Sequence, residues 1–313
     1  MKKRRDGYLS AQWMPLFLGA VFLAGCAGSP VERPRTIMKA EAAGNAGVDA
    51  FKSGDYQRAL DRFKESLRLD RATDNSPATL IDLMNVARTL VAVGDPKAAQ
   101  AYLDEAVELA VVLKNDKMLS EAYATYAKSA LVLDNPTDAR ALIEKALAID
   151  AKTGYKSGAR LNLKALIHIA AGRWAEAEVL LADALKLNES SGDKVEAANS
   201  LRLLGEVMTI RGEYERAVRY YGAAIEIDRV NADTSKLIVD MERMAAAQSK
   251  FGGHYEAAFT LERLFRMYED MGMKDEAATA LDAAIAESKA SGMIEKTRRL
   301  EGMKATQSSG NRQ

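Results

Sequence analysis

The stretch GEYERAVRYY at residues 212–221 decides the fold of this chain, because variants of it recur at regular intervals. GDYQRALDRF begins at Gly54 and GDPKAAQAYL begins at Gly94. Each copy has an alanine five positions after its start, and most have a large apolar residue four positions further on. Residues four apart share one helix face, so the alanine admits a neighbouring helix and the larger residue fills the space beside it. The copies start at Gly54, Gly94, Asp134, Gly172, Gly212 and Gly252, with steps of 40, 40, 38, 40 and 40 residues.

The residues between helices carry turn signals of their own. Gly94 can adopt the left-handed conformation that ends a helix. Asp95 can cap the next helix and Pro96 suits its first turn. Outside the turns the chain is rich in Ala, Leu, Glu and Lys, and aromatic residues make up only 6%, so we expect an all-α fold. A seventh copy at Gly272 follows only 20 residues after the sixth, which leaves the repeat register beyond residue 250 open.

The pattern resembles the tetratricopeptide repeat, a helix-turn-helix unit. Leu204 and Gly205, followed by Gly212, Tyr214 and Ala217, match the Leu-Gly, Gly-x-Tyr and Ala positions of that family. The period departs from the family, since the basic repeat has 34 residues and this one has about 40. The resemblance implies a right-handed superhelical α-solenoid of stacked helix pairs, in which each pair buries its apolar face against the next.

The amino-terminal segment is typical of an exported protein. Basic residues at 2–5 precede an apolar run of 13 residues from Trp13 to Gly25, too short for the about 20 residues that span a bilayer. The run ends in Leu23-Ala24-Gly25-Cys26, which resembles the lipobox of bacterial lipoproteins. In that family the cysteine is acylated with fatty acids such as palmitate and becomes the new amino terminus. The alternative is an ordinary signal peptide followed by a stray cysteine.

Lipidation would explain why Cys26, the only cysteine of the chain, has no partner for a disulfide. In enteric-type bacteria an aspartate after the cysteine retains a lipoprotein in the inner membrane. The next residue here is Ala27, so the resemblance favours the outer membrane facing the periplasm. That rule varies between bacterial groups. The expected domains are a signal peptide at 1–25, a lipidated tether at 26–39, the solenoid at 40–305 and a disordered tail at 306–313.

Charge and residue types point away from nucleic acids, metals and catalysis. The chain has 44 basic and 44 acidic residues, and removal of the basic leader leaves it slightly acidic, which does not suit nucleic acid. His168 and His254 are far apart, and no spacing of His, Cys and carboxylates suggests a metal. We expect His168 to be packed or to line a groove, and His254 to lie at a surface turn. Ser191 and Lys194 have the Ser-x-x-Lys spacing of penicillin-binding enzymes. That family also needs a Lys-Thr-Gly sequence after the serine, whereas in this chain the Lys-Thr-Gly comes before it. We expect neither an enzyme nor a cofactor.

The resemblance also implies where a partner binds. In this family the first helix of each unit lines the concave side, where extended peptides or partner helices dock. Asn and Arg side chains can bond a peptide backbone or a carboxylate. The carboxylate clamp of chaperone-binding members is not reproduced here, and the alternative is that these are ordinary solvent-facing residues. The candidate groove residues are Asn85, Arg88, Lys128, Asn162, Asn199, Arg202 and Glu206.

These features predict a lipid-anchored periplasmic scaffold that binds a protein partner of the cell envelope through its concave groove. The resemblance offers two precedents, pilotins that help to assemble pilus secretins and adaptor lipoproteins that recruit cell-wall enzymes. The sequence does not choose between them. The alternative is a lipoprotein that binds a small ligand or glycan, which a deep apolar pocket with convergent polar groups would favour.

Overall fold

Turns at a nearly constant spacing divide the chain into antiparallel helices. The computed structural model describes residues 34–231 and 234–310, and within these ranges it has fourteen α-helices and no strand. The helices are α1 (Arg35–Lys52), α2 (Tyr56–Ala72), α3 (Ser76–Ala92), α4 (Pro96–Val112), α5 (Asp116–Val132), α6 (Pro136–Thr153), α7 (Gly158–Ala170), α8 (Trp174–Ser191), α9 (Lys194–Ile210), α10 (Tyr214–Val230), α11 (Thr234–Phe251), α12 (His254–Asp270), α13 (Lys274–Ala290) and α14 (Ile294–Gly310).

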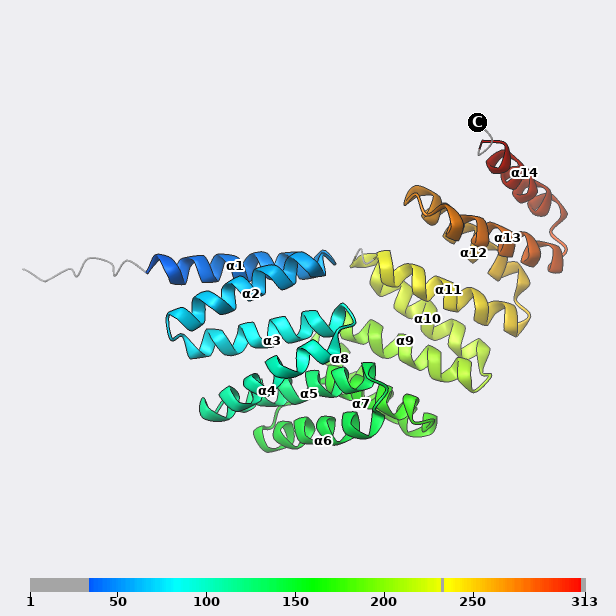
Figure 1. Cartoon of the computed structure of the whole chain (residues 1–313). Helices are drawn as coiled ribbons and strands as arrows, with labels where there is room; N and C mark the ends of the chain where they lie inside the picture. Colours follow the sequence, from blue (N-terminus) through cyan, green and yellow to red (C-terminus); the bar gives the residue numbers. More distant parts are fainter. Residues whose placement is uncertain (1–33, 232–233, 311–313) are drawn as a thin grey trace, which may run out of the picture.

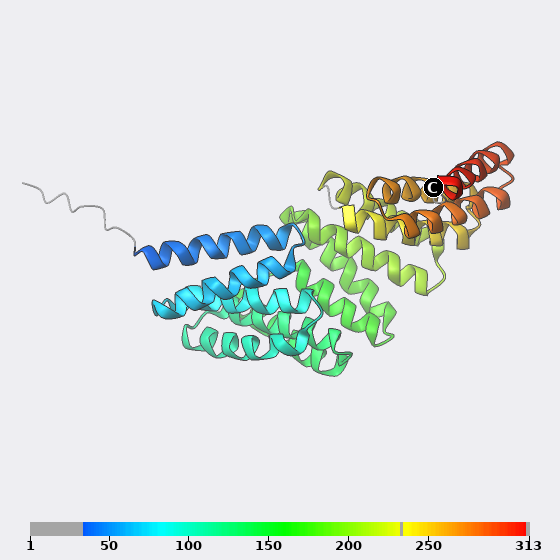
Figure 2. The same cartoon turned by 45° about the horizontal axis from the view of Figure 1, so that its top comes forward.

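Helices α1 to α14 form successive pairs that stack side by side into a curved solenoid (Figure 1), and the curvature is also visible in the turned view of Figure 2. The predicted all-α solenoid of tetratricopeptide-like units is therefore confirmed. The single step of 38 residues arises at α7, which has 13 residues where its neighbours have 17 or 18.

Turns with the same backbone conformation follow one another near the carboxyl end. Gly252, Gly272 and Gly292 all have a positive φ and lie 20 residues apart. Each of these turns follows a helix of 17 or 18 residues. Gly252 lies between α11 and α12, and Gly272 lies between α12 and α13, the helix on which α12 packs most extensively. Asp134 has φ 56°, which shows an aspartate in the left-handed conformation that glycine adopts in the other copies.

Both ends of the solenoid extend further than the sequence suggests. Helix α1 begins at Arg35, inside the predicted tether, because Pro34 suits the position just before a first helical turn. Helix α14 continues to Gly310, past the predicted limit at residue 305. It is held by the fully buried Leu300 and by ion pairs from Lys296 and Arg299 to Glu262 of α12. The predicted lipobox, Leu23 to Cys26, lies outside the described residues.

The small and large positions of the repeat form the core. All seven repeat alanines are buried, and so are six of the seven residues four positions further on. Leu261 is the exception, because it is only half-buried against the core that contains Leu264 and Phe265. The buried alanines are Ala59, Ala99, Ala139, Ala177, Ala217, Ala257 and Ala277, and the buried larger residues are Phe63, Leu103, Ile143, Leu181, Tyr221 and Leu281.

The predicted cap at Asp95 is confirmed, and Asn135 caps a later helix in the same way. The Asp95 carboxylate accepts a hydrogen bond of 3.1 Å from the backbone N–H of Ala98, and Pro96 follows it in the first turn of α4. Asn135 accepts a hydrogen bond of 3.2 Å from the N–H of Asp138 at the start of α6. Each cap satisfies a backbone donor that has no partner within its helix.

The packing of α9 on α10 depends on Gly205. A Cβ atom at this position would lie 2.6 Å from the ring of the buried Tyr221. We expect Gly205→Ala to lower the free energy of unfolding by roughly 1–3 kcal/mol, because the ring has to move. Gly222→Ala is the matched control, since its nearest neighbour is the Met244 sulfur at 3.9 Å. Alanine within a helix is favoured by about 0.5–1 kcal/mol over glycine. Equal urea midpoints for the two variants would contradict the prediction.

Candidate functional site

The first helices of five successive pairs surround a cavity of about 490 Å³, which we call the central groove. Phe51 of α1 and Leu203 of α9 line the same space, so the solenoid curves far enough to bring these two helices around one cavity. The groove therefore lies on the concave face, as the family resemblance implies. Its lining residues are Phe51, Arg88, Val91, Ala92, Glu121, Ala124, Thr125, Lys128, Ser157, Ala159, Arg160, Asn162, Leu163, Leu166, Glu196, Asn199, Arg202 and Leu203.

The groove brings together most of the residues singled out from the sequence. Five of the seven candidates are among its lining residues, namely Arg88, Lys128, Asn162, Asn199 and Arg202. Asn85 and Glu206 lie on the same helices but outside this cavity. Glu206 faces Arg243 of α11, with 3.6 Å between the charged groups. The candidate residues therefore lie on helices that line the cavity, although not every candidate lines it.

The Arg202 guanidinium is bonded on all sides within the chain. Its Nε and Nη2 donate to the carboxylate of Asp240 at 2.7 and 2.8 Å, and Nη2 also donates to Asp228. Its Nη1 donates to the Asn199 amide oxygen at 2.6 Å. The two carboxylates are almost wholly buried, at 2% and 0% exposure, so Arg202 neutralises a charge pair inside the solenoid. Arg202 thus holds α9, α10 and α11 together at the edge of the groove.

Arg160 is a groove residue that the sequence analysis missed. Its side chain is 4% exposed and pairs with Glu121 at 2.7 Å and with Asp150 at 3.1 Å. Glu121 also accepts a hydrogen bond of 2.6 Å from Arg88, so one carboxylate links α3, α5 and α7. Arg160 stands near the start of the short helix α7, and no local motif distinguishes it. Only the stacking of α6 on α7 brings Asp150 to it.

Lys128 differs from the other basic residues of the groove. It is exposed, and the described part of the chain provides no ion pair for it. Asn162, in contrast, donates hydrogen bonds to Glu196 and accepts one from Ser200, so its amide is used in packing α7 on α9. Among the predicted residues, Lys128 is the charged group best placed to meet a partner.

The histidines do not belong to this site. Burial, followed by the charges of Arg173 and Lys164, lowers the pKa of His168, and His168 does not line the central groove. His254 lies at the start of α12, with its Nδ1 2.7 Å from a carboxylate oxygen of Glu287. Within residues 34–231 and 234–310 no three His, Cys, Asp or Glu side chains are arranged to hold a metal ion. None of the described helices is long and apolar enough to cross a membrane.

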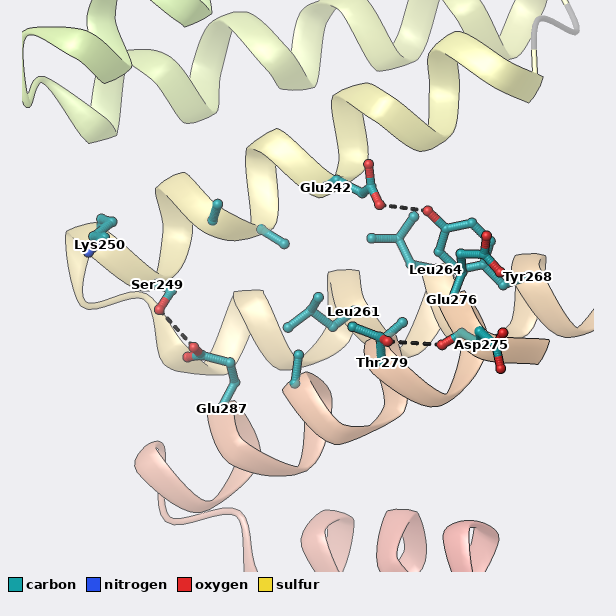
Figure 3. Close-up of a pocket in the computed structure, with 14 residues that line it drawn as sticks. Glu242, Ser249, Lys250, Leu261, Leu264, Tyr268, Asp275, Glu276, Thr279 and Glu287 are labelled. Atoms are coloured by element: carbon teal, nitrogen blue, oxygen red, sulfur yellow. Dashed lines mark hydrogen bonds between the residues drawn. The ribbon is translucent and has the colours of Figure 1, made fainter. Parts of the chain in front are cut away.

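A second cavity of about 620 Å³ lies between α11, α12 and α13 (Figure 3), and we call it the C-terminal cavity. Leu261 and Leu264 provide apolar surface within it. Tyr268 donates a hydrogen bond of 2.6 Å to Glu242, and Ser249 donates one of 2.7 Å to Glu287. Burial, together with the hydrogen bond and charge of Glu242, raises the pKa of Tyr268, so this hydroxyl stays protonated and donates. The acidic lining residues are Glu242, Asp275, Glu276 and Glu287, beside the single base Lys250.

Solved structures share this fold at low sequence identity. A signal transduction ATPase with numerous domains and a tetratricopeptide repeat sensor, from Pyrococcus horikoshii, superposes with a TM-score of 0.65 and 17% identity over 85% of this chain. The present chain spans only 41% of that protein. A Rap protein complexed with competence and sporulation factor gives a TM-score of 0.62 at 15% identity, covering 88% of this chain and 78% of the other. BtubC from P. vanneervenii gives 0.58 at 18%, covering 77% and 93%.

Family models cover most of the solenoid. Two models, each described as a tetratricopeptide repeat, match residues 39–110 and 155–229 in one case and residues 86–155 in the other. No curated protein matches the chain. The models, the helix pairs and the solved structures agree on one assignment: the chain belongs to the tetratricopeptide repeat family.

Proposed function

We propose that this protein is a lipid-anchored scaffold of the bacterial cell envelope, which binds a protein partner in the central groove and takes part in assembling an envelope complex. The observation that carries the proposal is the groove itself, built by the first helices of five successive pairs. Helices stacked in this way present a continuous surface to one partner segment. The role is that of an adaptor without catalytic activity.

The lining of the groove suits a protein segment. Phe51, Leu163 and Leu203 provide apolar contacts, and exposed Lys128 provides a charge that a partner carboxylate can meet. Extended segments combine such apolar anchors with a few polar contacts. The Rap protein of the same fold was solved with competence and sporulation factor bound, which supports a ligand-binding role for a solenoid of this kind.

Photo-crosslinking in cells tests the groove. A photoreactive residue at position 128 should capture one dominant partner, identified by mass spectrometry, because this side chain is exposed within the groove. The matched control is a probe at exposed Lys186 on α8, a second helix that does not line the groove. The proposal requires a protein that is captured from position 128 and not from position 186. The same set of proteins from both positions would remove the central groove as the docking site.

The anchor has a separate test at Cys26. We expect Cys26→Ser to move the protein from the membrane fraction to the soluble periplasmic fraction and to abolish labelling by fatty acid. Each buried CH₂ of an acyl chain contributes about 0.8 kcal/mol, so loss of two or more chains removes the anchor. Ala27→Ser, one residue away, should remain in the membrane fraction. If Cys26→Ser still fractionates with membranes, the lipoprotein assignment is wrong.

A second candidate function is the binding of a small ligand or glycan in the C-terminal cavity. Its volume of about 620 Å³ falls within the roughly 300–1,000 Å³ of small-molecule sites. Apolar Leu261 and Leu264 lie there beside the polar groups of Ser249, Tyr268 and Glu287. Native mass spectrometry of the purified protein should then show a bound small molecule. Ala283→Trp, which fills the cavity, should abolish that added mass, and an unchanged spectrum would exclude this site.

A further inference from the structure

The C-terminal cavity leaves apolar surface exposed at a position that the other repeats bury. Leu261 of α12 stands where six other copies of the repeat have a buried large residue, yet it is only half-buried and lines the cavity. Ala246 of α11 is exposed and Ala283 of α13 is partly exposed, and both line the same space. Three helices therefore present an apolar floor to solvent. An apolar group bound there would remove this surface from water.

The cavity is elongated along two helix faces. Glu242, Ala246 and Lys250 of α11 are spaced four residues apart, so they lie on one face of that helix. Glu276 and Glu287 of α13 are eleven residues apart, which is three helical turns and about 16 Å at 1.5 Å per residue. The cavity thus has two ends, one near the start of α13 and one near its end (Figure 3).

Carboxylates gather at the end near the start of α13. Figure 3 shows three acidic side chains around Tyr268, namely those of Glu242, Asp275 and Glu276. The Tyr268 hydroxyl donates a hydrogen bond of 2.6 Å to Glu242. Burial raises the pKa of this hydroxyl, and the charges of Glu242 and Glu276 add to the effect, so both carboxylates lie close to it. Negative charge is therefore concentrated at one end of an apolar cavity.

The described part of the chain does not neutralise these charges. Glu242, Asp275 and Glu276 are exposed, and none of them forms an ion pair with a described basic residue. Asp275 and Glu276 lie in the first turn of α13, where the helix dipole favours acidic side chains. Glu242 lies in the middle of α11, so no helix end accounts for its position. A cation bound between Glu242 and Glu276 would supply the missing positive charge.

The opposite end of the cavity is different. Glu287 accepts a hydrogen bond of 2.7 Å from Ser249, and its other carboxylate oxygen lies 2.7 Å from Nδ1 of His254. Lys250, the only base among the described residues that line the cavity, lies at this end (Figure 3). The carboxylate at this end already has partners, whereas the three at the other end are open to a ligand. A ligand with a cation at one end only matches this asymmetry.

We propose that the C-terminal cavity binds an organic cation, with its ammonium group between Glu242 and Glu276 and its apolar body along Leu261. The proposal rests on the second candidate function and gives the chemical class of the small ligand. Ala283 lies seven residues after Glu276, about 10 Å further along α13, so the apolar body should have about this length. A primary ammonium suits the site because its three N–H donors can reach more than one carboxylate.

Calorimetric titration of the purified protein with octylammonium tests the proposal. This probe combines a primary ammonium with an unbranched apolar chain, so we expect saturable binding at one site. Octanoate has a similar chain with the opposite charge and should show no measurable binding. Methylammonium has the charge without the chain and should bind about a hundredfold more weakly, because buried CH₂ groups contribute much of the binding free energy. Equal affinities for octylammonium and octanoate, or no binding of octylammonium, would overturn the proposal.

Two substitutions locate the bound ammonium group. Glu242→Gln and Glu276→Gln each keep the size of the side chain and remove one charge. Each should lower the affinity for octylammonium about tenfold, as the loss of a hydrogen bond to a charged group does. Glu108→Gln, at an exposed position on α4, is the matched control and should leave the affinity unchanged. If both cavity variants bind octylammonium as tightly as wild type, the proposal is wrong.

The outcomes separate this proposal from the second candidate function. If native mass spectrometry shows a small molecule that Ala283→Trp removes, but octylammonium binds no better than octanoate, the cavity is a ligand site and the cation proposal fails. If no small molecule is found and neither probe binds, both fail. If Ala283→Trp does not fold, Ala246→Trp takes its place, since Ala246 is an exposed residue of the same cavity.

Discussion

Replacing Arg202 with methionine should lower the free energy of unfolding by about 3–5 kcal/mol, because the substitution leaves two buried carboxylates without a cation. Asp228 and Asp240 are 2% and 0% exposed, so water cannot replace the guanidinium. Methionine retains much of the apolar part of the arginine side chain, so the measured change in stability reports mainly the loss of the charge. Amide hydrogen exchange should show faster opening of α9, α10 and α11, and urea denaturation should show the loss of stability.

Two further variants control this prediction. Arg202→Met combined with Asp228→Asn and Asp240→Asn should recover most of the stability, since neutral side chains need no counter-charge. Arg219→Met removes a surface pair with Glu215, whose partners are 61% and 62% exposed. Such surface pairs contribute about 0–1 kcal/mol. If Arg202→Met costs no more than Arg219→Met, the buried pair is not what holds this junction.

Asp82→Asn should stabilise the protein at neutral and alkaline pH. Burial raises the pKa of Asp82 from 3.8 to about 7 in the folded protein. The folded state therefore keeps a proton that the unfolded chain releases, and stability falls as the pH rises from about 4 to about 7. Each unit of pKa shift corresponds to about 1.36 kcal/mol, so the full loss is about 4 kcal/mol. Above about pH 7 the loss is complete and stability no longer depends on this group.

The measurement is the stability difference between Asp82→Asn and wild type at several pH values. The difference should be small near pH 4, grow through the window from 4 to 7, and level off above it. Asp61→Asn, at an exposed position on α2, is the matched control and should show no such growth. A difference for Asp82→Asn that stays constant with pH would contradict a proton held by Asp82.

The α10–α11 junction and the α2–α3 junction each contain two buried carboxylates, but the two pairs are neutralised in different ways. The carboxylates of Asp228 and Asp240 pair with Arg202, so a basic side chain of the same chain neutralises them. No basic side chain among the described residues pairs with Asp70 or Asp82, so the contribution of Asp82 to the stability of the fold depends on pH.

Part of the lining of the central groove could be foreseen from the sequence. The repeat placed Arg88, Lys128 and Arg202 on first helices, and the family resemblance assigned those helices to the concave face. The sequence could not show that Arg202 is bonded within the chain while Lys128 is exposed. Both are basic residues on an amphipathic helix, and the difference depends on which carboxylates lie beside them after stacking.

The sequence by itself determined the helical repeat of this protein. Its information is local. Alanines and larger residues four apart make one face of a helix, and glycine, or in a few described turns aspartate or lysine, adopts the left-handed conformation. Only the tertiary structure decided which charges meet. Asp150 and Arg160 lie ten residues apart on consecutive helices, and Asp240 and Arg202 lie 38 apart. Such pairs form when one helix pair stacks on the next, and burial then makes each charge depend on its neighbour.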